Sequence, residues 1–207
     1  MRDVKSRAGT VRAERAAETR RRIEAAARAL FALRGYGATT LREIADEAGV
    51  AVQTVYAVYR SKASILGALR DGLRDEPEAV AAYRTALAEP DPRRSLEHFA
   101  RALRIRWSNG HDIVTIHVEA ASVDPAIRAD LVRLMETRRG GLFGLARSLA
   151  AKPGGPGDID RTVAVLDALT LPEVYAQLVV TNGWTPDAYE TWLAGELRHA
   201  VLERAAE

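Results

Sequence analysis

The sequence contains no cysteine among its 207 residues. Disulfide bonds, thiol catalysis and zinc sites built on thiolates are therefore excluded. No apolar run approaches the roughly 20 residues that a membrane-spanning helix needs. The basic N-terminus is not followed by the apolar segment of a secretory signal. We therefore expect a cytoplasmic protein without a membrane partner.

Signatures of the common enzyme classes are also missing. The chain has no G-x-S-x-G motif, no phosphate-binding loop and no paired-carboxylate pattern, and its four histidines show no spacing such as H-E-x-x-H. His117 and Glu119 are two residues apart and would point to different faces of a helix, which makes them a poor metal site. We expect no catalytic residues, no metal and no other cofactor. An uncharacterised enzyme, or a helical protein-interaction module with a vestigial DNA-binding segment, stays open as an alternative.

Patterns typical of β-strands are absent, and apolar residues recur at helical spacing instead. Hydrophobic residues make up 47% of the chain, which is enough for a folded core. We predict an all-α fold in which Thr19 caps the first helix and Gly35 ends it. Further helices are expected at about 40–48, 52–59, 61–74, 78–88, 93–108, 111–121, 125–151, 159–182 and 186–205.

Charge divides the chain into a basic end and an acidic body. Residues 1–75 hold 15 basic and 9 acidic side chains, a net charge of +6, whereas the rest of the chain carries −4. Such a basic end suggests a polyanionic partner, although a solvated tail explains the charge equally well. We predict three parts: a basic flexible arm over 1–18, a DNA-binding domain over 19–74 and a larger helical domain over 75–207.

The segment TTLREIADEAGV, which ends at Val50, has the pattern of a helix-turn-helix. Thr40 and Glu43 form a capping box at the start of the first helix. Ala45 allows two helices to approach, Gly49 permits the sharp turn, and Val55 packs the second helix onto the first. This spacing predicts a three-helix DNA-binding domain.

The second helix of such a motif presents its first residues to the major groove. Gln53 can pair with adenine through two hydrogen bonds, Thr54 can use its hydroxyl or its methyl, and Val52 or Ala57 can contact a thymine methyl. We therefore expect these residues to read bases.

Other side chains of the motif suit the DNA backbone. Lys62 follows the N-cap residue Ser61, where a cation opposes the helix dipole but can hold a phosphate. Tyr56 is long enough to reach a phosphate, and Arg42 can reach a phosphate or a guanine. Tyr59 fits either a phosphate contact or the core. The basic residues of the arm could follow the minor groove or the phosphates; they are Arg2, Lys5, Arg7, Arg12 and Arg15.

The run from Glu18 to Leu69 resembles the DNA-binding domain of TetR-family transcriptional regulators. The residues that carry the resemblance are the skeleton GY, TT, IA, AGV, TVY, Y, SK and L. The resemblance implies phosphate contacts by Thr40, Tyr56 and Lys62. It also implies base contacts by Arg42, Val52, Gln53 and Thr54.

Three residues depart from the family pattern. Ala51 stands where a Ser-like cap is usual, so the reading helix would be less firmly capped. Val58 stands at a position where a polar residue is usual, and Tyr59 replaces phenylalanine. A phosphate contact is then lost at Val58 or supplied by Tyr59.

The same resemblance implies that the C-terminal domain dimerises and binds a small effector. An apolar effector pocket is expected around Phe99, Leu103, Trp107, Val114, His117, Met135 and Tyr175. A dimer interface is expected on the last two helices, around Val174, Leu178, Tyr189, Trp192, Leu193, Leu197 and Val201. Residues of an ordinary helical core would show the same pattern in both places.

We therefore expect a ligand-responsive transcriptional regulator. By this interpretation it is a repressor that binds a palindromic operator as a homodimer and is released by a small effector.

Overall fold

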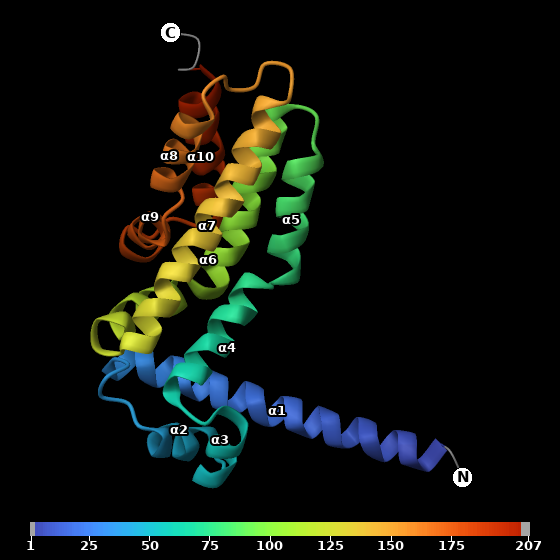
Figure 1. Cartoon of the computed structure of the whole chain (residues 1–207), viewed down its shortest axis with the longest axis vertical. Coiled ribbons are helices and arrows are strands. Elements are labelled where there is room, and N and C mark those ends of the chain that lie inside the picture. The colour runs from blue at the N-terminus through green and yellow to red at the C-terminus, as the bar shows by residue number, and fades with distance from the viewer. Residues whose placement is uncertain (1–2, 204–207) are drawn as a thin grey trace. The chain divides into compact units, whose positions relative to one another are not determined.

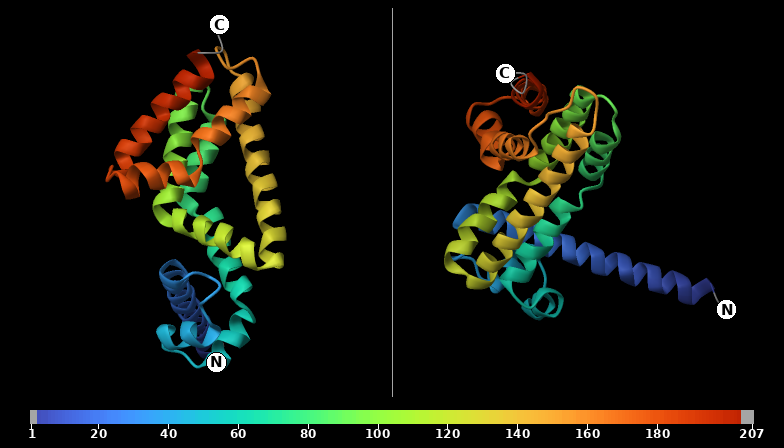
Figure 2. Two further views of the ribbon diagram at one scale, coloured as in Figure 1. Left: turned by 90° about the vertical axis from the view of Figure 1, so that its left-hand side faces the viewer. Right: turned by 45° about the horizontal axis from the view of Figure 1, so that its top comes forward.

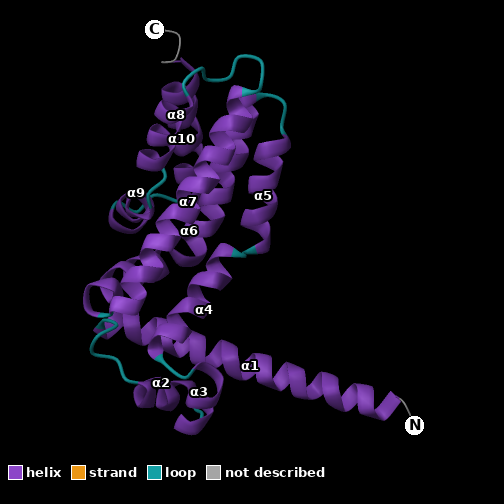
Figure 3. Ribbon diagram, in the orientation of Figure 1, coloured by secondary structure: helices purple, strands orange, loops and turns teal. Residues whose placement is uncertain are grey.

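The computed structural model describes residues 3–203, and every regular element in this range is a helix (Figures 1 and 3). The predicted all-α class is confirmed. The α-helices are α1 (Asp3–Arg34), α2 (Leu41–Ala48), α3 (Val52–Tyr59), α4 (Lys62–Arg74), α5 (Pro77–Ala88), α6 (Pro92–Val123), α7 (Pro125–Ala150), α8 (Ile159–Leu169), α9 (Pro172–Tyr175) and α10 (Pro186–Arg198). Two short π-helical segments, η1 (Ala176–Thr181) and η2 (His199–Glu203), continue α9 and α10.

The chain divides into two compact units. The first comprises the chain up to Asp71 together with Thr115–Ala129, and the second comprises Gly72–Val114 and the chain from Asp130 on. The chain therefore passes from one unit to the other inside α4, α6 and α7. Thr115–Ala129 lies within the range 75–207 predicted as the C-terminal domain, but it belongs to the first unit.

The prediction that a helix begins at Thr19 is wrong, because α1 begins at Asp3. Thr19 lies inside α1, and its hydroxyl donates to the Arg15 carbonyl oxygen at 2.9 Å. Alanine, arginine and glutamate dominate this segment and favour a helix even without a buried face. Arg12 and Arg15 are exposed on α1. Arg2 and the side chains of Lys5 and Arg7 lie outside what the structure describes, so a DNA-binding role of the arm stays a prediction.

The core of the first unit forms where the apolar positions of α1 meet α2, α3 and α4. Ile23, Ala27 and Phe31 of α1 are buried, as the spacing predicted. Ile44 of α2 and Val55 of α3 are fully buried as well. Burial of these side chains fixes the short helices α2 and α3, which would not be stable alone.

The second unit is a helical bundle (Figure 2). Its core contains buried side chains of α5 to α10 and of η2, and side chains of η1 pack against it. The predicted break near residue 110 is a kink within α6, where Gly110 has non-helical backbone angles (φ −173°, ψ 34°). A Cβ at Gly110 would lie 2.8 Å from a methyl of Leu73 and 3.0 Å from a methyl of Ile113. A side chain at residue 110 would thus require these methyls to move.

Pro172 divides the segment predicted as one helix over 159–182. α8 ends at Leu169, and Pro172 begins α9 at the position where proline is best tolerated.

No single helix among the described residues is long and apolar enough to cross a membrane. The bent pair formed by Ile159–Leu169 and Pro172–Thr181, at 42° to each other, passes that test by length and composition.

Candidate nucleic-acid interface

α2 and α3 form a helix-turn-helix whose turn is fixed by local signals. Gly49 ends α2 in the left-handed conformation (φ 63°, ψ 41°), which glycine adopts without strain. The Arg22 guanidinium donates to the carbonyl oxygens of Ala48 at 2.5 Å and Gly49 at 3.1 Å. α1 is thereby tied to the C-terminal end of α2, where a cation is favoured.

The capping box predicted at Thr40 is confirmed. The Glu43 amide donates to the Thr40 hydroxyl oxygen at 3.2 Å, and the Thr40 amide donates to the Glu43 carboxylate at 2.8 Å. The Thr40 hydroxyl also donates to the Glu43 carboxylate at 2.8 Å. This hydrogen bond, followed by the one from the Thr40 amide, lowers the pKa of Glu43, with a smaller effect of Arg34 in the same direction. Thr40 therefore fixes the start of α2. It is also exposed at the surface.

The first turn of α3 presents the side chains that were predicted to read bases. Gln53 is exposed, and Val52 and Thr54 are half-buried. Ala51 precedes the helix without a side-chain cap, as the departure from the family pattern predicted. The Thr54 amide instead donates to the Ala51 carbonyl oxygen at 2.9 Å.

An open groove of about 700 Å³ lies between the start of α2, the outer face of α3 and the start of α4. It brings together five of the eight residues predicted to contact DNA: Thr40, Arg42, Val52, Tyr56 and Lys62. Gln53 and Thr54 lie on α3 outside its lining. Tyr56 is 54% exposed, so its hydroxyl is available to a ligand.

Lys62 has a structural role in addition to lining the groove. Its ammonium donates to the Tyr36 carbonyl oxygen at 2.7 Å and to that of Gly37 at 3.3 Å. It also lies 4.5 Å from the centre of the Tyr36 ring, a cation–π contact. Burial lowers the pKa of Lys62, against the opposing effect of Asp124 and Glu43. The lysine thus holds the turn between α1 and α2 at the edge of the groove.

Tyr59 is in the core rather than at the surface. It is 8% exposed, and its hydroxyl donates to the carboxylate of Glu24 on α1. Burial raises the pKa of Tyr59, and the hydrogen bond to Glu24 raises it further. Of the two interpretations left open by the sequence, the structure supports packing in the core.

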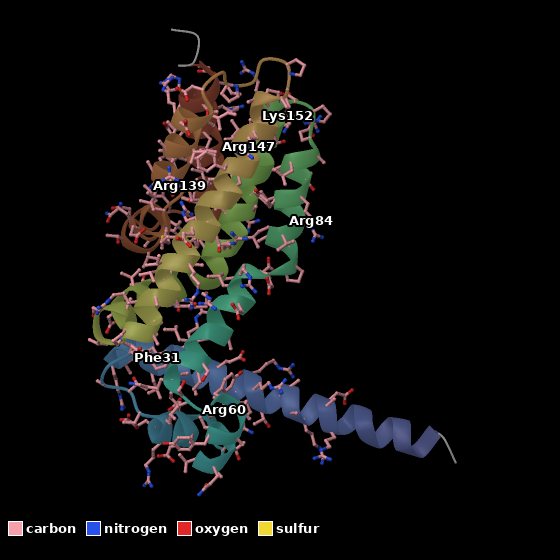
Figure 4. The ribbon with its side chains drawn as sticks, in the orientation of Figure 1. Phe31, Arg60, Arg84, Arg139, Arg147 and Lys152 are labelled. Carbon is pink, nitrogen blue, oxygen red and sulfur yellow. The ribbon has the colours of Figure 1, made fainter. Side chains whose placement is uncertain are left out.

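The groove is also lined by residues that the sequence analysis did not select for it, among them Tyr36, Arg60, Ser61 and Asp124. Arg60, labelled in Figure 4, follows α3 with a positive φ of 58°. In the sequence, Arg60 stands between Tyr59 and Ser61, two residues before Lys62. This position is a local signal that could have identified Arg60 as a residue of the groove. Asp124 follows α6, far along the chain, so only the fold could reveal it.

The groove combines the cations Arg42, Arg60 and Lys62 with the hydroxyl of Tyr56 and, among the residues that the structure describes, a single carboxylate, that of Asp124. Such a set of donors around an open groove suits a phosphate. The exposed first turn of α3 lies beside it, in the position from which a helix reads the major groove.

Comparison with known proteins agrees with this geometry. Residues 23–69 match the family described as bacterial regulatory proteins, tetR family. The N-terminal part of the chain thus matches the TetR family over these residues. The HTH-type transcriptional regulator TtgR of Pseudomonas putida is 38% identical over 79 residues, a match that covers 38% of this chain and 38% of that regulator. The match thus spans well under half of TtgR.

Solved structures resemble almost the whole chain in fold. NalD of Pseudomonas aeruginosa, the secondary repressor of the MexAB-OprM multidrug efflux pump, superposes with a TM-score of 0.71 at 23% identity, over 91% of this chain and 98% of that one. The TetR-family regulator PfmR of Thermus thermophilus superposes with a TM-score of 0.64 at 23% identity, over 87% and 94%. At this identity the likeness establishes the fold alone.

The residues that the TetR resemblance suggested for an effector pocket are divided between the two units, and the pocket stays a prediction. Phe99, Leu103, Trp107 and Tyr175 are buried in the core of the second unit, with Val114 packed against it. His117 belongs to the first unit, where burial lowers its pKa, as does Arg70 to a lesser extent. Met135 is 44% exposed. Helical periodicity marks a buried face but does not show with which unit that face packs.

The residues suggested for a TetR-like dimer interface are largely internal. Tyr189, Leu193, Leu197 and Val201 are at most 3% exposed and belong to the core of the second unit. Val174, Leu178 and Trp192 pack against the same core and are half-buried. The apolar stripe of α10 is therefore directed into its own bundle, and a dimer interface on these helices stays a prediction.

Proposed function

We propose that this chain is a transcriptional repressor that binds a palindromic operator as a homodimer and is released by a small effector. The observation that carries the proposal is the groove beside α3, where Arg42, Tyr56 and Lys62 surround a space suited to a phosphate. A phosphate held there would orient α3 so that Gln53 faces the edges of the bases.

A homodimer follows from the small size of the reading element. α3 has eight residues, and one such helix buries too little surface for tight operator binding. Two copies would double the contact and would require half-sites about 34 Å apart. The exposed apolar side chains Leu171, Val180 and Trp184, which lie between α8 and α10, are our candidates for the interface.

Release by an effector would act through the spacing of the two reading helices. An effector that prefers a state with another spacing by a few kcal/mol would prevent both helices from binding together. α4, α6 and α7 each contribute residues to both units, so a change in the second unit has covalent routes to the first. Equal spacing of the reading helices in DNA-bound and effector-bound protein would rule this mechanism out.

The test is selection of DNA by the purified full chain from random fragments. The proposal expects a palindrome with half-sites about one helical turn apart. Enrichment of single, unpaired sites would contradict the dimer, and absence of any enriched sequence would contradict operator binding.

A further inference from the structure

Arg60 has a backbone conformation that residues with a side chain seldom adopt. Its φ is 58° and its ψ is −36°, and among the described residues it is the one residue other than glycine with a positive φ. The Ser61 amide donates to the Tyr59 carbonyl oxygen at 2.6 Å, across Arg60. This hydrogen bond and these angles form a γ-turn with a positive φ, which is rare and strained.

Hydrogen bonds on both sides hold the γ-turn in place. The Arg60 amide donates to the Tyr56 carbonyl oxygen at 3.1 Å and closes the last turn of α3. On the other side, the amides of Ser61 and Ser64 each donate to the hydroxyl oxygen of the other serine at 3.2 Å. The Ser64 hydroxyl also donates to the Tyr59 carbonyl oxygen. The neighbouring residues therefore impose the conformation on Arg60, which is the condition under which a strained residue persists.

No polar contact of the Arg60 side chain explains the strain. The side chain is exposed, and its guanidinium has no hydrogen bond or salt bridge with the part of the chain that the structure describes. Glycine would adopt the same backbone angles without strain. A residue that lowers stability and forms no compensating bond within the fold is a candidate for a functional role.

The groove beside α3 is the place where Arg60 could have such a role. Val52, Tyr56 and Arg60 are four residues apart, a spacing that puts side chains on one face of a helix. All three line the groove, and Lys62 lines it from the start of α4. Arg60 thus extends the face of α3 that borders the groove and adds a cation at its end.

The donors of the two neighbouring cations differ in how far they are used. An ammonium has three donors, and that of Lys62 already donates to the carbonyl oxygens of Tyr36 and Gly37. The five donors of a guanidinium form a planar fork that matches two oxygens of a phosphate. Because the fold does not use this fork at Arg60, the arginine offers more donors to a phosphate than the lysine does.

We propose that Arg60 binds a phosphate of the DNA backbone in the groove, and that the strained γ-turn is retained because it places the guanidinium there. Arg60 thus lowers the stability of the free protein and raises its affinity for DNA. The inference rests on the proposed function and adds Arg60 to the residues that contact the operator.

Titration of Arg60→Gly, Arg60→Ala and Arg60→Lys with the selected duplex at several salt concentrations tests the contact. For each arginine removed, the first two variants should lose affinity roughly fivefold at physiological salt, and the slope of log affinity against log salt should fall by about 1. Arg60→Lys should keep the slope but bind more weakly than the wild type, because an ammonium lacks the fork. Arg84→Ala is the control, because Arg84 is an exposed arginine of α5 in the second unit (Figure 4), and it should change neither quantity.

Thermal unfolding of the same variants tests the strain. Arg60→Gly should melt roughly 2–4 °C above Arg60→Ala, because alanine keeps the Cβ that makes a positive φ unfavourable. Arg60→Gly should also melt above the wild type although it binds DNA more weakly, a combination that a purely structural arginine would not produce. Melting of Arg60→Gly at or below Arg60→Ala would overturn the inference, and so would an unchanged salt slope in both variants.

The wild type separates this inference from the function on which it rests. Selection of an operator whose affinity does not change when Arg60 is replaced would overturn the inference alone. Failure of the wild type to select any duplex would overturn the proposed function. Binding to a shuffled duplex would then still test Arg60, because phosphate contacts do not depend on sequence, and an unchanged salt slope in Arg60→Ala would overturn the inference as well.

Discussion

The hydroxyl of Tyr36 donates to the carboxylate of Asp124 at 3.2 Å, although 88 residues separate the two along the chain. Tyr36 lies in the turn between α1 and α2, and Asp124 lies in the turn between α6 and α7. Burial raises the pKa of Tyr36, and Asp124 raises it further. The other oxygen of Asp124 accepts from the Ala126 amide at 2.9 Å, at the start of α7. One carboxylate thus joins the end of α6 to the wall of the candidate phosphate groove.

Asp124→Asn should strengthen DNA binding, because Asp124 is the one acidic side chain that the described residues contribute to the lining of the groove. Asparagine can still cap α7, so the change mainly removes a negative charge near the proposed phosphate. We expect a gain of about 0.2–1 kcal/mol, typical of an exposed charge interaction, measured by titration with operator DNA. Asp158→Asn, which changes the N-cap of α8 in the second unit, is the control. Weaker binding by Asp124→Asn would mean that no phosphate approaches this residue.

Lys62→Met should weaken binding to all DNA sequences by a similar factor. The slope of log affinity against log salt should fall by about 1 for each lysine removed. Lys152→Met is the matched control, because Lys152 also donates to a carbonyl oxygen, that of Ala86 at 3.2 Å, but in the second unit. Both variants should lose stability, and only the first should change the salt slope. An unchanged slope would assign Lys62 to the turn between α1 and α2 alone.

Tyr56→Phe and Tyr59→Phe should affect different properties, the first DNA binding and the second the free energy of unfolding. Tyr56 is exposed, so loss of its hydroxyl should weaken DNA binding by about 0.5–1.5 kcal/mol and leave the free energy of unfolding unchanged. Tyr59 donates to Glu24 in the core, so loss of its hydroxyl should lower the free energy of unfolding by about 1 kcal/mol. Denaturant unfolding and DNA titration of both variants measure the difference. Reversed results would exchange the roles of the two tyrosines.

Gln53→Ala should change base preference at one position in each half-site by about 1–3 kcal/mol. The reason is that Gln53 is exposed on the first turn of α3 and can pair with adenine. Binding to duplexes that carry each base at each position measures the effect. Gln177→Ala makes the same chemical change at an exposed position of η1 and should leave the preference intact. A uniform loss over all duplexes would show that Gln53 contacts the backbone instead.

Gly49→Ala should lower the free energy of unfolding by about 1–2 kcal/mol, the cost of a left-handed conformation with a side chain. The new Cβ would also lie 2.7 Å from Nη2 of Arg22, whose guanidinium would have to move. Gly37→Ala is the control, because a Cβ there has no neighbouring heavy atom within 4 Å. Equal stability of the two variants would mean that the turn tolerates another conformation.

Local signals predicted the helix-turn-helix well. Capping by Thr40, the turn at Gly49 and burial of Val55 each act within a few residues, so the bounds of α2, α3 and α4 were predicted to within one residue. The beginning of α1 was missed because Thr19 looks like a cap, whereas the preceding residues favour a helix by propensity alone. An apolar residue at position 19 would not have suggested that a helix begins there.

Features that depend on distant segments were not predictable in the same way. Nothing near Asp124 in the sequence indicates that it reaches Tyr36, and His117 was grouped with Trp107 although the two lie in different units. The apolar stripe with Tyr189 and Leu193 was assigned to a dimer, because a stripe facing a partner and a stripe facing its own core have the same period. Only the three-dimensional packing distinguishes these cases.

The central claim is that α3 reads a sequence while the groove holds the backbone, and one comparison tests it directly. The affinity of the full chain for its selected duplex is measured beside that for a shuffled duplex at physiological salt. We predict a preference of at least about 10³-fold for the selected duplex. Equal affinities that vanish together as salt is raised would show a protein that binds polyanions without reading them, and would contradict the claim.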